Sequence, residues 1–182
     1  MKLYEAPLPG LMVIEPKMFN DSRGYFFEPF HQFRYAKAGI PSFVQDNFSH
    51  SKHNVIRGLH YQQLPKAQGK LVWVMRGAAW DVVVDIRLKS KTFGRWFNII
   101  LTAENHLQLY IPPGFAHGFC ALSDEVDFCY KCTDVYAPDN ECGIAWNDPK
   151  LNIPWPVTTP ILSPKDEVFP CLHEIKHENL FP

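Results

Sequence analysis

An all-β domain is the fold class that this sequence predicts, and three observations predict it. Aromatic residues make up 14% of the chain, with 14 Phe, 7 Tyr and 5 Trp, and such side chains favour strands. The 16 prolines are spread along the chain and argue against long helices. Short apolar runs recur with turn residues between them, which is typical of a sandwich or a barrel. We expect one domain that spans residues 1–182.

The N-terminal part of the chain contains one predicted turn and one predicted short helix. Asp21-Ser22-Arg23-Gly24 forms a turn before the aromatic run at 25–27. Residues 31–38 are the only convincing helical stretch in the first half, and Gly39 and then Pro41 end it. Helices are therefore expected to be short and peripheral.

From Lys70 onward the chain reads as successive strands. Leu107, Leu109 and Ile111 alternate with polar or amphipathic residues, and this period of two predicts a half-buried strand. We expect the runs 119–122 and 126–132 to form a hairpin around the turn at 123–125. The predicted strands are 70–75, 79–86, 96–101, 107–111, 119–122 and 126–132.

The C-terminal part carries a predicted helix start and a polar tail. Ser163 stands at a helix N-cap position, with Pro164 first in the helix and an acid, Asp166, three residues after the cap. Beyond about residue 170 the chain is polar, and we expect it to be peripheral and loosely held.

The overall charge excludes several classes of partner. The net charge is −1, so no basic field indicates nucleic acid and no polybasic run indicates a membrane surface. No apolar run reaches about 18 residues, and the N-terminus has no apolar core of a signal peptide. Five cysteines cannot form a complete internal set of disulfides, so a reducing cytoplasm is the expected location.

The segment Arg57-Gly58-Leu59-His60-Tyr61-Gln62 concentrates groups suited to chemistry on a polar small molecule. Histidine in general titrates near neutral pH, so His60 suits proton transfer, whereas Arg57 and the nearby Lys70 can hold an oxyanion or a phosphate. The alternative is that His60 is an ordinary hydrogen-bonded histidine of the core or surface. Local sequence leaves both open.

Two further residues are candidates for the same chemistry. Tyr130 shares strand parity with Val126 and Phe128, so it is expected to point into the interior, either as a core residue or as a proton donor facing a cavity. Asp166 is either a first-turn acid that favours the helix dipole or the group that orients a catalytic imidazole.

Metal and redox chemistry are not favoured by the remaining motifs. His117 lies among turn and aromatic residues, but His60 lacks a second histidine or a glutamate at ligand spacing, so we expect no metal site. Cys129 and Cys132 would point to opposite faces of one strand and are interpreted as packing residues. The same-parity residues Asp81, Asp85 and Arg87 are interpreted as a solvated face or a structural ion pair.

Taken together, segments across the chain resemble those of the dTDP-4-dehydrorhamnose 3,5-epimerases, enzymes of nucleotide-sugar metabolism. Eight matching pieces occur in the family's order: FNDSRGYFFEPF (19–30), FVQDNFSHS (43–51), VIRGLHYQ (55–62), AQGKLV (67–72), DVVVDIR (81–87), LYIPPGFAHGF (109–119), YAPDNECGIAWNDP (136–149) and LSPKD (162–166). Any one piece is a weak signal, but eight in order form a specific one.

The resemblance implies a cupin-type jelly-roll barrel, a homodimer, and an isomerase with no metal or organic cofactor. It places the histidine base on His60, the orienting aspartate on Asp166, the tyrosine acid on Tyr130 and the enolate-stabilising lysine on Lys70. Contacts to the nucleotide sugar fall on Arg23, Glu28, Gln45, Asn47, Arg57, His117, Glu141 and Lys165.

The implied reaction inverts C3 and C5 of dTDP-4-dehydro-6-deoxy-D-glucose in dTDP-L-rhamnose biosynthesis. One alternative is a single-site epimerase or a ketoisomerase that acts on a related dTDP-keto sugar. A metal-dependent oxygenase of the cupin type and a non-catalytic sugar-binding barrel are two others. The sequence does not determine which polysaccharide or metabolite the product supplies.

Overall fold

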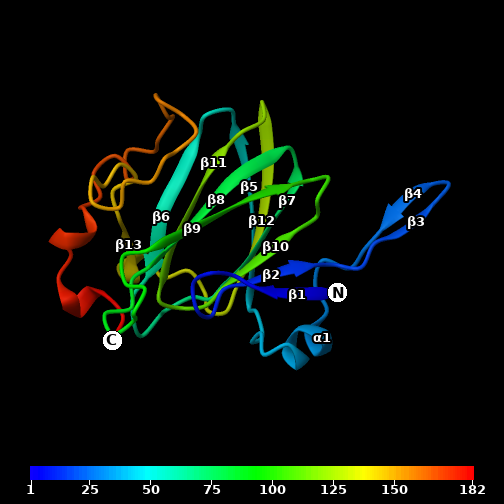
Figure 1. Ribbon diagram of the computed structural model, residues 1–182, viewed down its shortest axis with the longest axis horizontal. Coiled ribbons are helices and arrows are strands. Elements are labelled where there is room, and N and C mark those ends of the chain that lie inside the picture. Colours follow the sequence, from blue (N-terminus) through cyan, green and yellow to red (C-terminus); the bar gives the residue numbers. More distant parts are fainter.

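Two antiparallel sheets face each other and form the body of the molecule in the computed structural model, which describes residues 1–182 (Figure 1). The larger sheet has the strand order β1 (Lys2–Glu5), β2 (Met12–Glu15), β10 (Gln108–Ile111), β7 (Lys70–Arg76), β12 (Glu125–Cys132) and β5 (Gln45–Lys52). The smaller sheet has the order β13 (Glu141–Gly143), β6 (Ile56–Gln62), β11 (Phe115–Ala121), β8 (Ala78–Asp85) and β9 (Trp96–Thr102).

From β5 to β13 the strands alternate between the two sheets, apart from the β8–β9 hairpin. This alternation gives the double-sheet roll, and the all-β prediction is confirmed. The few helical segments are short: α1 (Gln32–Lys37), η1 (Pro138–Asn140), η2 (Leu172–Glu174) and η3 (His177–Asn179). None of the helices has the length and apolar character needed to cross a membrane.

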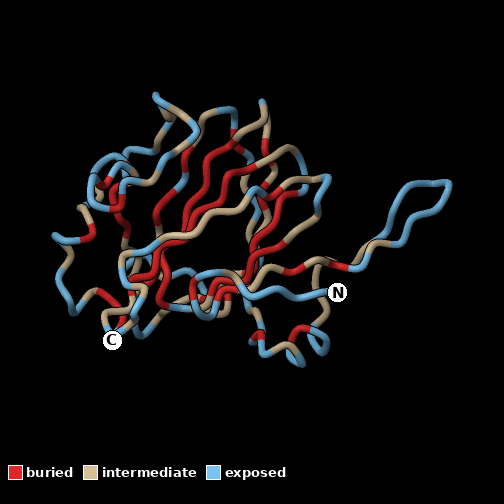
Figure 2. The backbone as a smooth tube through the Cα atoms, in the orientation of Figure 1, coloured by how far each residue is buried: buried red, intermediate tan, exposed pale blue.

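Three apolar clusters hold the layers together, and Figure 2 shows the buried residues concentrated along the strands. The first lies between the sheets and includes Val72, Val83 and Phe128. The second covers the outer face of the smaller sheet and includes Val82 and Val84, while the third lies between the larger sheet and α1. Neighbouring residues of one strand thus pack in different clusters, because both faces of the central strands are covered.

Burial on both faces corrects the expectation of a half-buried strand at 107–111. The strand β10 is present, but Gln108 and Tyr110 are buried as well as Leu109 and Ile111. The Gln108 side chain is satisfied because it accepts a hydrogen bond from the Tyr35 hydroxyl at 2.7 Å and donates one to the Pro29 carbonyl, also at 2.7 Å. The segment around α1 therefore supplies the polar partners that solvent was expected to supply.

The hairpin expected around residues 123–125 is wrong. Strand β11 pairs with β6 and β8 in the smaller sheet, whereas β12 pairs with β5 and β7 in the larger one. Phe119 of β11 and Phe128 of β12 stack across the core, with ring centroids 4.1 Å apart and planes 4° apart. The connection crosses from one sheet to the other because these two rings bury each other face to face between the sheets.

Two expectations for the C-terminal part are also wrong. Residues 164–167 form a turn rather than a helix, although Ser163 does cap it: its hydroxyl accepts the Asp166 N–H at 3.2 Å. The tail is not loosely held, because Leu172, Leu180 and Phe181 are buried in the cluster on the smaller sheet. The average polarity of the tail concealed these few apolar anchors.

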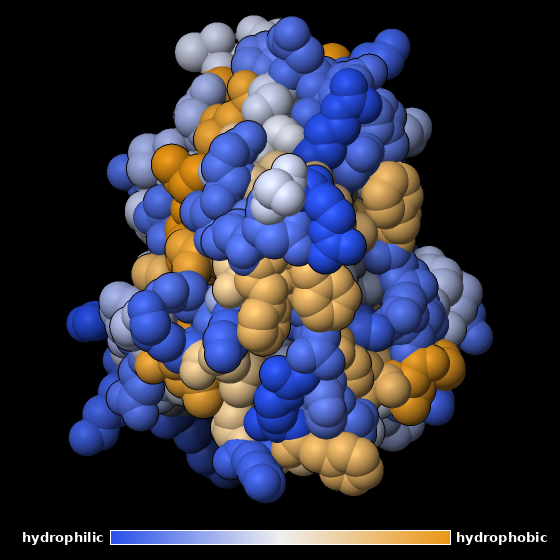
Figure 3. Space-filling view, turned by 90° about the vertical axis from the view of Figure 1, so that its right-hand side faces the viewer, coloured by the Kyte–Doolittle hydropathy of each residue, from blue (hydrophilic) through white to orange (hydrophobic).

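The hairpin of β3 (Phe19–Asp21) and β4 (Gly24–Phe26) projects from the body as an arm (Figure 1), and the turn predicted at 21–24 is confirmed. All six strand residues are exposed, including Phe19 and the 63% exposed Phe26. Figure 3 views the molecule from the side of the arm and shows hydrophobic side chains gathered among hydrophilic ones. A two-stranded hairpin is marginal on its own, so this arm has the character of a contact surface.

We predict that Phe181→Ala lowers the free energy of unfolding by about 3 kcal/mol, because it empties a buried aromatic position of the tail. Urea denaturation measures the effect. The matched control is Val168→Ala, at a side chain that is 77% exposed, which should change the free energy by less than about 0.5 kcal/mol. Equal, small effects of the two variants would show that the tail contributes nothing to the core.

Candidate active site

One large cavity, of about 930 Å³, opens between the two sheets, and ten of the twelve residues predicted for the site line it. The ten are Gln45, Asn47, Arg57, His60, Lys70, His117, Tyr130, Glu141, Lys165 and Asp166. They come from both sheets and from the turn at 163–166, so residues scattered over the sequence converge on one space. The floor of the cavity includes Phe119 and Phe128, the stacked pair of the core.

A short hydrogen bond joins His60 to Asp166. His60 lies in the middle of β6, between Gly143 on β13 and His117 on β11, and its Nε2 is 2.5 Å from Oδ1 of Asp166. Asp166 is buried, and the ring of Phe169 packs edge-on against the imidazole with centroids 5.6 Å apart. The imidazole is thus held by a carboxylate and a ring, and Nδ1 is the nitrogen left to exchange a proton.

The electrostatic surroundings keep this pair as a neutral base beside an ionised acid. Burial lowers the pKa of His60, and the positive charges of Lys70 and Lys165 lower it further, against the raising effect of Asp166. Burial alone would raise the pKa of Asp166, but the hydrogen bond and the charge of His60 bring it below its usual value. His60 can therefore accept a proton near neutral pH, and Asp166 can stabilise the imidazolium that results.

Tyr130 faces this pair from the opposite sheet. It lies on β12, beside Asn47 of β5 and Val72 of β7, and lines the cavity together with Phe128 and Cys132. The predicted inward parity is therefore confirmed. Burial raises the pKa of the Tyr130 hydroxyl, so the group is protonated at neutral pH and is suited to donate a proton. A buried imidazole and a protonated phenol thus line one cavity from opposite sheets.

Lys70 begins β7 and reaches the cavity without a hydrogen bond or an ion pair to any protein group. Burial lowers the pKa of its ammonium, while Cys132, Glu141 and Asp81 act in the opposite direction. A cation with no fixed partner in a half-enclosed site is available to an anionic oxygen of a ligand.

The polar residues around one wall are held in place by each other. Glu141 accepts hydrogen bonds from the Lys165 ammonium at 2.6 Å and from the Tyr136 hydroxyl at 2.8 Å. Gln45 donates to Asn47 at 2.9 Å, which fixes the direction of both amides. This wall offers positive charge, amides and an aromatic ring. Such groups suit a pyrophosphate and a nucleotide base.

Arg57 and His117 are positioned in the same manner. The Arg57 guanidinium donates to the Ser51 hydroxyl at 2.9 Å and to the His50 carbonyl at 3.0 Å. Nε2 of His117 is 2.8 Å from Oδ2 of Asp81, which is fully buried. Both side chains reach the cavity from strands of the smaller sheet.

Sequence reasoning missed Asp81, which it placed on a solvated face or in an ion pair. Asp85 and Arg87 do form an ion pair, at 2.7 Å, but Asp81 is buried beneath His117. The signal that could have found it is a carboxylate set within the apolar run Ala79–Val84. Tyr136, which also lines the cavity, was likewise not singled out.

Arg23 and Glu28 are the two predicted residues that do not line the cavity. Arg23 lies in the arm, where its guanidinium pairs with Asp21 at 2.6 Å and its side chain is 88% exposed. Glu28 follows the arm and pairs with Arg34. Within one chain, neither residue reaches His60.

Comparison with known proteins places this geometry in a family. The family model described as dTDP-4-dehydrorhamnose 3,5-epimerase matches residues 5–174. The chain belongs to the dTDP-4-dehydrorhamnose 3,5-epimerase family. The family resemblance and the cupin-type jelly-roll fold that the sequence implied are both confirmed.

Relatives cover this epimerase-family chain almost completely. The dTDP-4-dehydrorhamnose 3,5-epimerase of Shigella flexneri is 51% identical over 168 residues, which is 91% of this chain and 93% of that protein. A crystal structure of the dTDP-6-deoxy-D-glucose-3,5-epimerase from Legionella pneumophila in complex with dTDP-4-keto-L-rhamnose is 49% identical. It has a TM-score of 0.95 and covers 99% of this chain and 97% of that one. The dTDP-4-dehydrorhamnose 3-epimerase of Streptomyces niveus is 40% identical over 184 residues, covering 100% of this chain and 89% of that protein.

We predict that the acidic limb of the pH–rate profile, where activity falls at low pH, reflects the protonation of His60. Activity should fall as the pH drops through the lowered pKa of His60, since protonation removes the base. In Asp166→Asn the limb should move to still lower pH, because Asp166 raises the pKa of His60, and the plateau rate should fall about 10²-fold or more. Measurement of kcat/KM against pH tests both. The exposed Glu167→Gln is the control, and an unmoved limb in Asp166→Asn would contradict the coupling.

Proposed function

We propose that this protein is a cofactor-independent epimerase that inverts C3 and C5 of dTDP-4-dehydro-6-deoxy-D-glucose and yields dTDP-4-dehydro-L-rhamnose. The observation that carries the proposal is the His60–Asp166 pair facing Tyr130 across one cavity, with Lys70 beside them. Family membership and the names of the relatives support the same substrate class. The product would enter dTDP-L-rhamnose biosynthesis, and a cytoplasmic location fits the unpaired cysteines.

The reaction follows from the chemistry of a 4-keto sugar. The C4 carbonyl acidifies the hydrogens on C3 and C5, and removal of one proton leaves an enolate with its charge on the C4 oxygen. His60 takes the proton from one face of the ring, and a proton returned to the opposite face by Tyr130 restores the ketone with that carbon inverted. No redox step occurs, because the substrate loses one proton and regains one. Exchange with solvent then removes the proton from His60 and returns one to Tyr130.

The rate enhancement expected from each proposed role has a known order of magnitude. Positioned proton transfer contributes roughly 10²–10⁴-fold to a rate, and a single donor to a developing oxyanion contributes about 10²–10³-fold. We assign the second task to Lys70, whose ammonium has no protein partner. Asp166 keeps the imidazole in one tautomer and stabilises its protonated form.

The remaining lining residues suit the nucleotide part of the substrate. We assign the pyrophosphate to Arg57 and Lys165, since cationic side chains match its charge and the guanidinium binds phosphate oxygens in a bidentate manner. The amides of Gln45 and Asn47 offer hydrogen bonds, and the ring of Tyr136 offers a surface for stacking on thymine. These assignments complete a site for a dTDP-linked sugar.

Incubation with the dTDP-4-keto-6-deoxyglucose substrate in deuterated water tests the proposed function. We predict deuterium at both C3 and C5 with the wild-type protein, and a loss of both by about 10²-fold or more in His60→Ala, because the base is gone. Mass spectrometry and NMR measure the positions. Circular dichroism checks that the variant is folded. Near-normal deuterium exchange in a folded His60→Ala protein would contradict the assignment of His60 as the base.

The variant Tyr130→Phe distinguishes the proposed role of Tyr130 from that of His60. Tyr130→Phe keeps the ring and removes only the hydroxyl, so the packing should survive while reprotonation fails. His60 should still remove a proton and let it exchange with solvent, so inversion should fall far more than exchange, most visibly at C5. The measurement is the ratio of deuterium wash-in to epimerised product. An unchanged ratio would make Tyr130 a packing residue.

A single-site epimerase is the second candidate function. The observation that favours it is the Streptomyces niveus relative, named a 3-epimerase, which aligns over the full chain. The same deuterium experiment separates the two functions, because a single-site enzyme gives label at C3 and none at C5.

We further propose a homodimer in which the arm completes the site of the partner. Strand β1 is an exposed sheet edge, and an uncovered edge favours pairing with another chain. The arm exposes Phe19, Tyr25 and Phe26, and it carries Arg23, a cation that the cavity of its own chain does not use. Exchange of the arms would bury these rings and bring Arg23 to the substrate of the neighbouring subunit.

Mixed dimers test this arrangement. Arg23→Ala and His60→Ala homodimers should both be nearly inactive, but a co-expressed heterodimer, purified by two tags, should regain about half of the wild-type activity. In that heterodimer one site has a native His60 and receives a native arm. Light scattering should give about twice 21.0 kDa. An inactive heterodimer would place Arg23 in its own chain's site, and a monomer would refute the dimer.

A further inference from the structure

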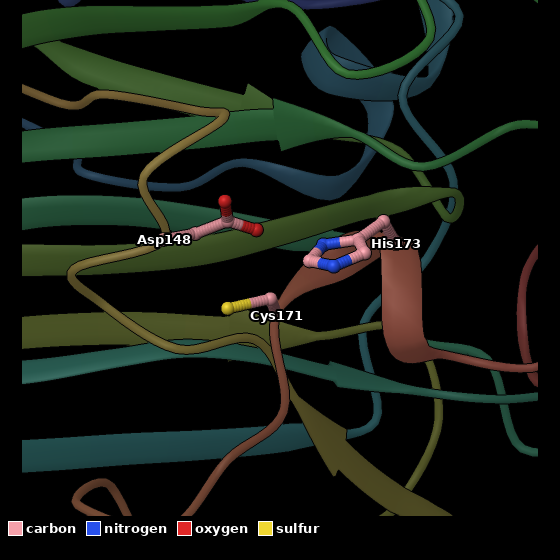
Figure 4. Close-up of side chains that lie close together, drawn as sticks. All are labelled: Asp148, Cys171 and His173. Carbon is pink, nitrogen blue, oxygen red and sulfur yellow. The ribbon is translucent and has the colours of Figure 1, made fainter.

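Outside the cavity, three side chains of different chemistry converge where the tail meets the body. Asp148 lies on the loop after β13, and Cys171 and His173 lie at the start of η2 (Figure 4). One donor atom from each lies within 4.8 Å of the other two. None of the three lines the cavity, and none has a role in the proposed reaction.

The carboxylate is fixed by the backbone and still has a free acceptor position. Oδ1 of Asp148 accepts the N–H groups of Lys150 at 2.7 Å and Leu151 at 3.3 Å, while Oδ2 accepts only that of Leu172, at 2.7 Å. A carboxylate oxygen has two lone pairs, so one on Oδ2 remains. Asp148 is 1% exposed, and its orientation is set before any ligand arrives.

The other two donors are held less firmly. The Cys171 thiol forms no disulfide and is half-buried at the N-cap of η2, where its sulfur accepts the Glu174 N–H. The exposed imidazole of His173 makes no hydrogen bond or ion pair. Tetrahedral zinc, with bonds of about 2.0–2.3 Å, needs donor atoms roughly 3.3–3.7 Å apart. Metal binding would draw the three donor atoms together from their present spacing, which lies within 4.8 Å.

We propose that Asp148, Cys171 and His173 form a zinc site, with water in the fourth position. A thiolate, an imidazole and a carboxylate are the ligand types that zinc takes, whereas calcium and magnesium require mainly oxygen donors. The thiolate and the carboxylate together neutralise the divalent ion, and the nearby Glu174 carboxylate, which accepts the Cys171 N–H at 2.8 Å, adds negative charge.

The position of the site gives the metal a structural task. The Ala145 N–H donates to the Pro170 carbonyl at 2.8 Å, so the loop and the tail are already joined just beside the cluster. The same tail begins with Asp166 and Phe169, which hold His60. A zinc ion would cross-link the loop to the tail and stabilise the segment on which the imidazole depends, without contact to the substrate.

Cobalt and zinc binding test the proposal. Reduced wild-type protein should bind one equivalent of Co²⁺ and develop the near-ultraviolet thiolate-to-cobalt charge-transfer band. Cys171→Ser should lose the band, and His173→Ala should bind more weakly. The matched controls, Cys129→Ser on the larger sheet and the exposed His177→Ala, should behave as wild type.

Thermal unfolding gives an independent readout. Zinc at a hundredfold excess over its dissociation constant should raise the Tm of the wild type by roughly 5–10 °C, and that of Cys171→Ser much less. A chelator should reverse the shift and leave epimerisation well below the Tm unchanged, which separates this proposal from the proposed function. Absence of stoichiometric metal, a charge-transfer band that survives Cys171→Ser, or wild-type binding by His173→Ala would overturn it.

Discussion

The hydrogen bond between His60 and Asp166 is the constraint around which the C-terminal third of the chain is arranged. It joins residues 106 positions apart, so the chain after β13 must wrap around the smaller sheet and return to the cavity. Backbone hydrogen bonds guide this return: Ile144 and Ile161 each pair with the edge of the sheet near β6. Without that wrapping, the imidazole would face solvent with no carboxylate beside it.

Gly143 shows how closely this arrangement is packed. A Cβ atom at this position would lie 2.4 Å from the ring of Phe169, the ring that packs against His60. The glycine is therefore required by close approach, and any side chain would displace the segment that carries Asp166. The close packing at Gly143 thus constrains the His60–Asp166 pair through the ring of Phe169.

The two-sheet roll also explains how one strand serves both stability and chemistry. Along the inward face of β12, Val126 and Phe128 fill the core, and Tyr130 and Cys132 then line the cavity. The core stabilises the walls, while the cavity keeps polar and charged groups that would weaken a closed interior. Lys70, whose ammonium lacks a protein partner, is the clearest example of stability given up where a ligand is expected.

By itself the sequence determined the all-β class, the approximate bounds of most strands between residues 70 and 132, the inward direction of Tyr130 and ten of the residues that line the cavity. These depend on local periodicity, on turn residues, or on motifs that stay in order along the chain. Tertiary structure alone decided which strands pair, because β11 and β12 look like a hairpin locally but lie in opposite sheets. It also decided that Gln108 and Asp81 are buried, and that Arg23 lies outside the cavity of its own chain. The physical reason is that the pairing of a strand, the burial of its side chains and the cavity that a side chain can reach all depend on the segments packed around it. Those segments are distant in the sequence.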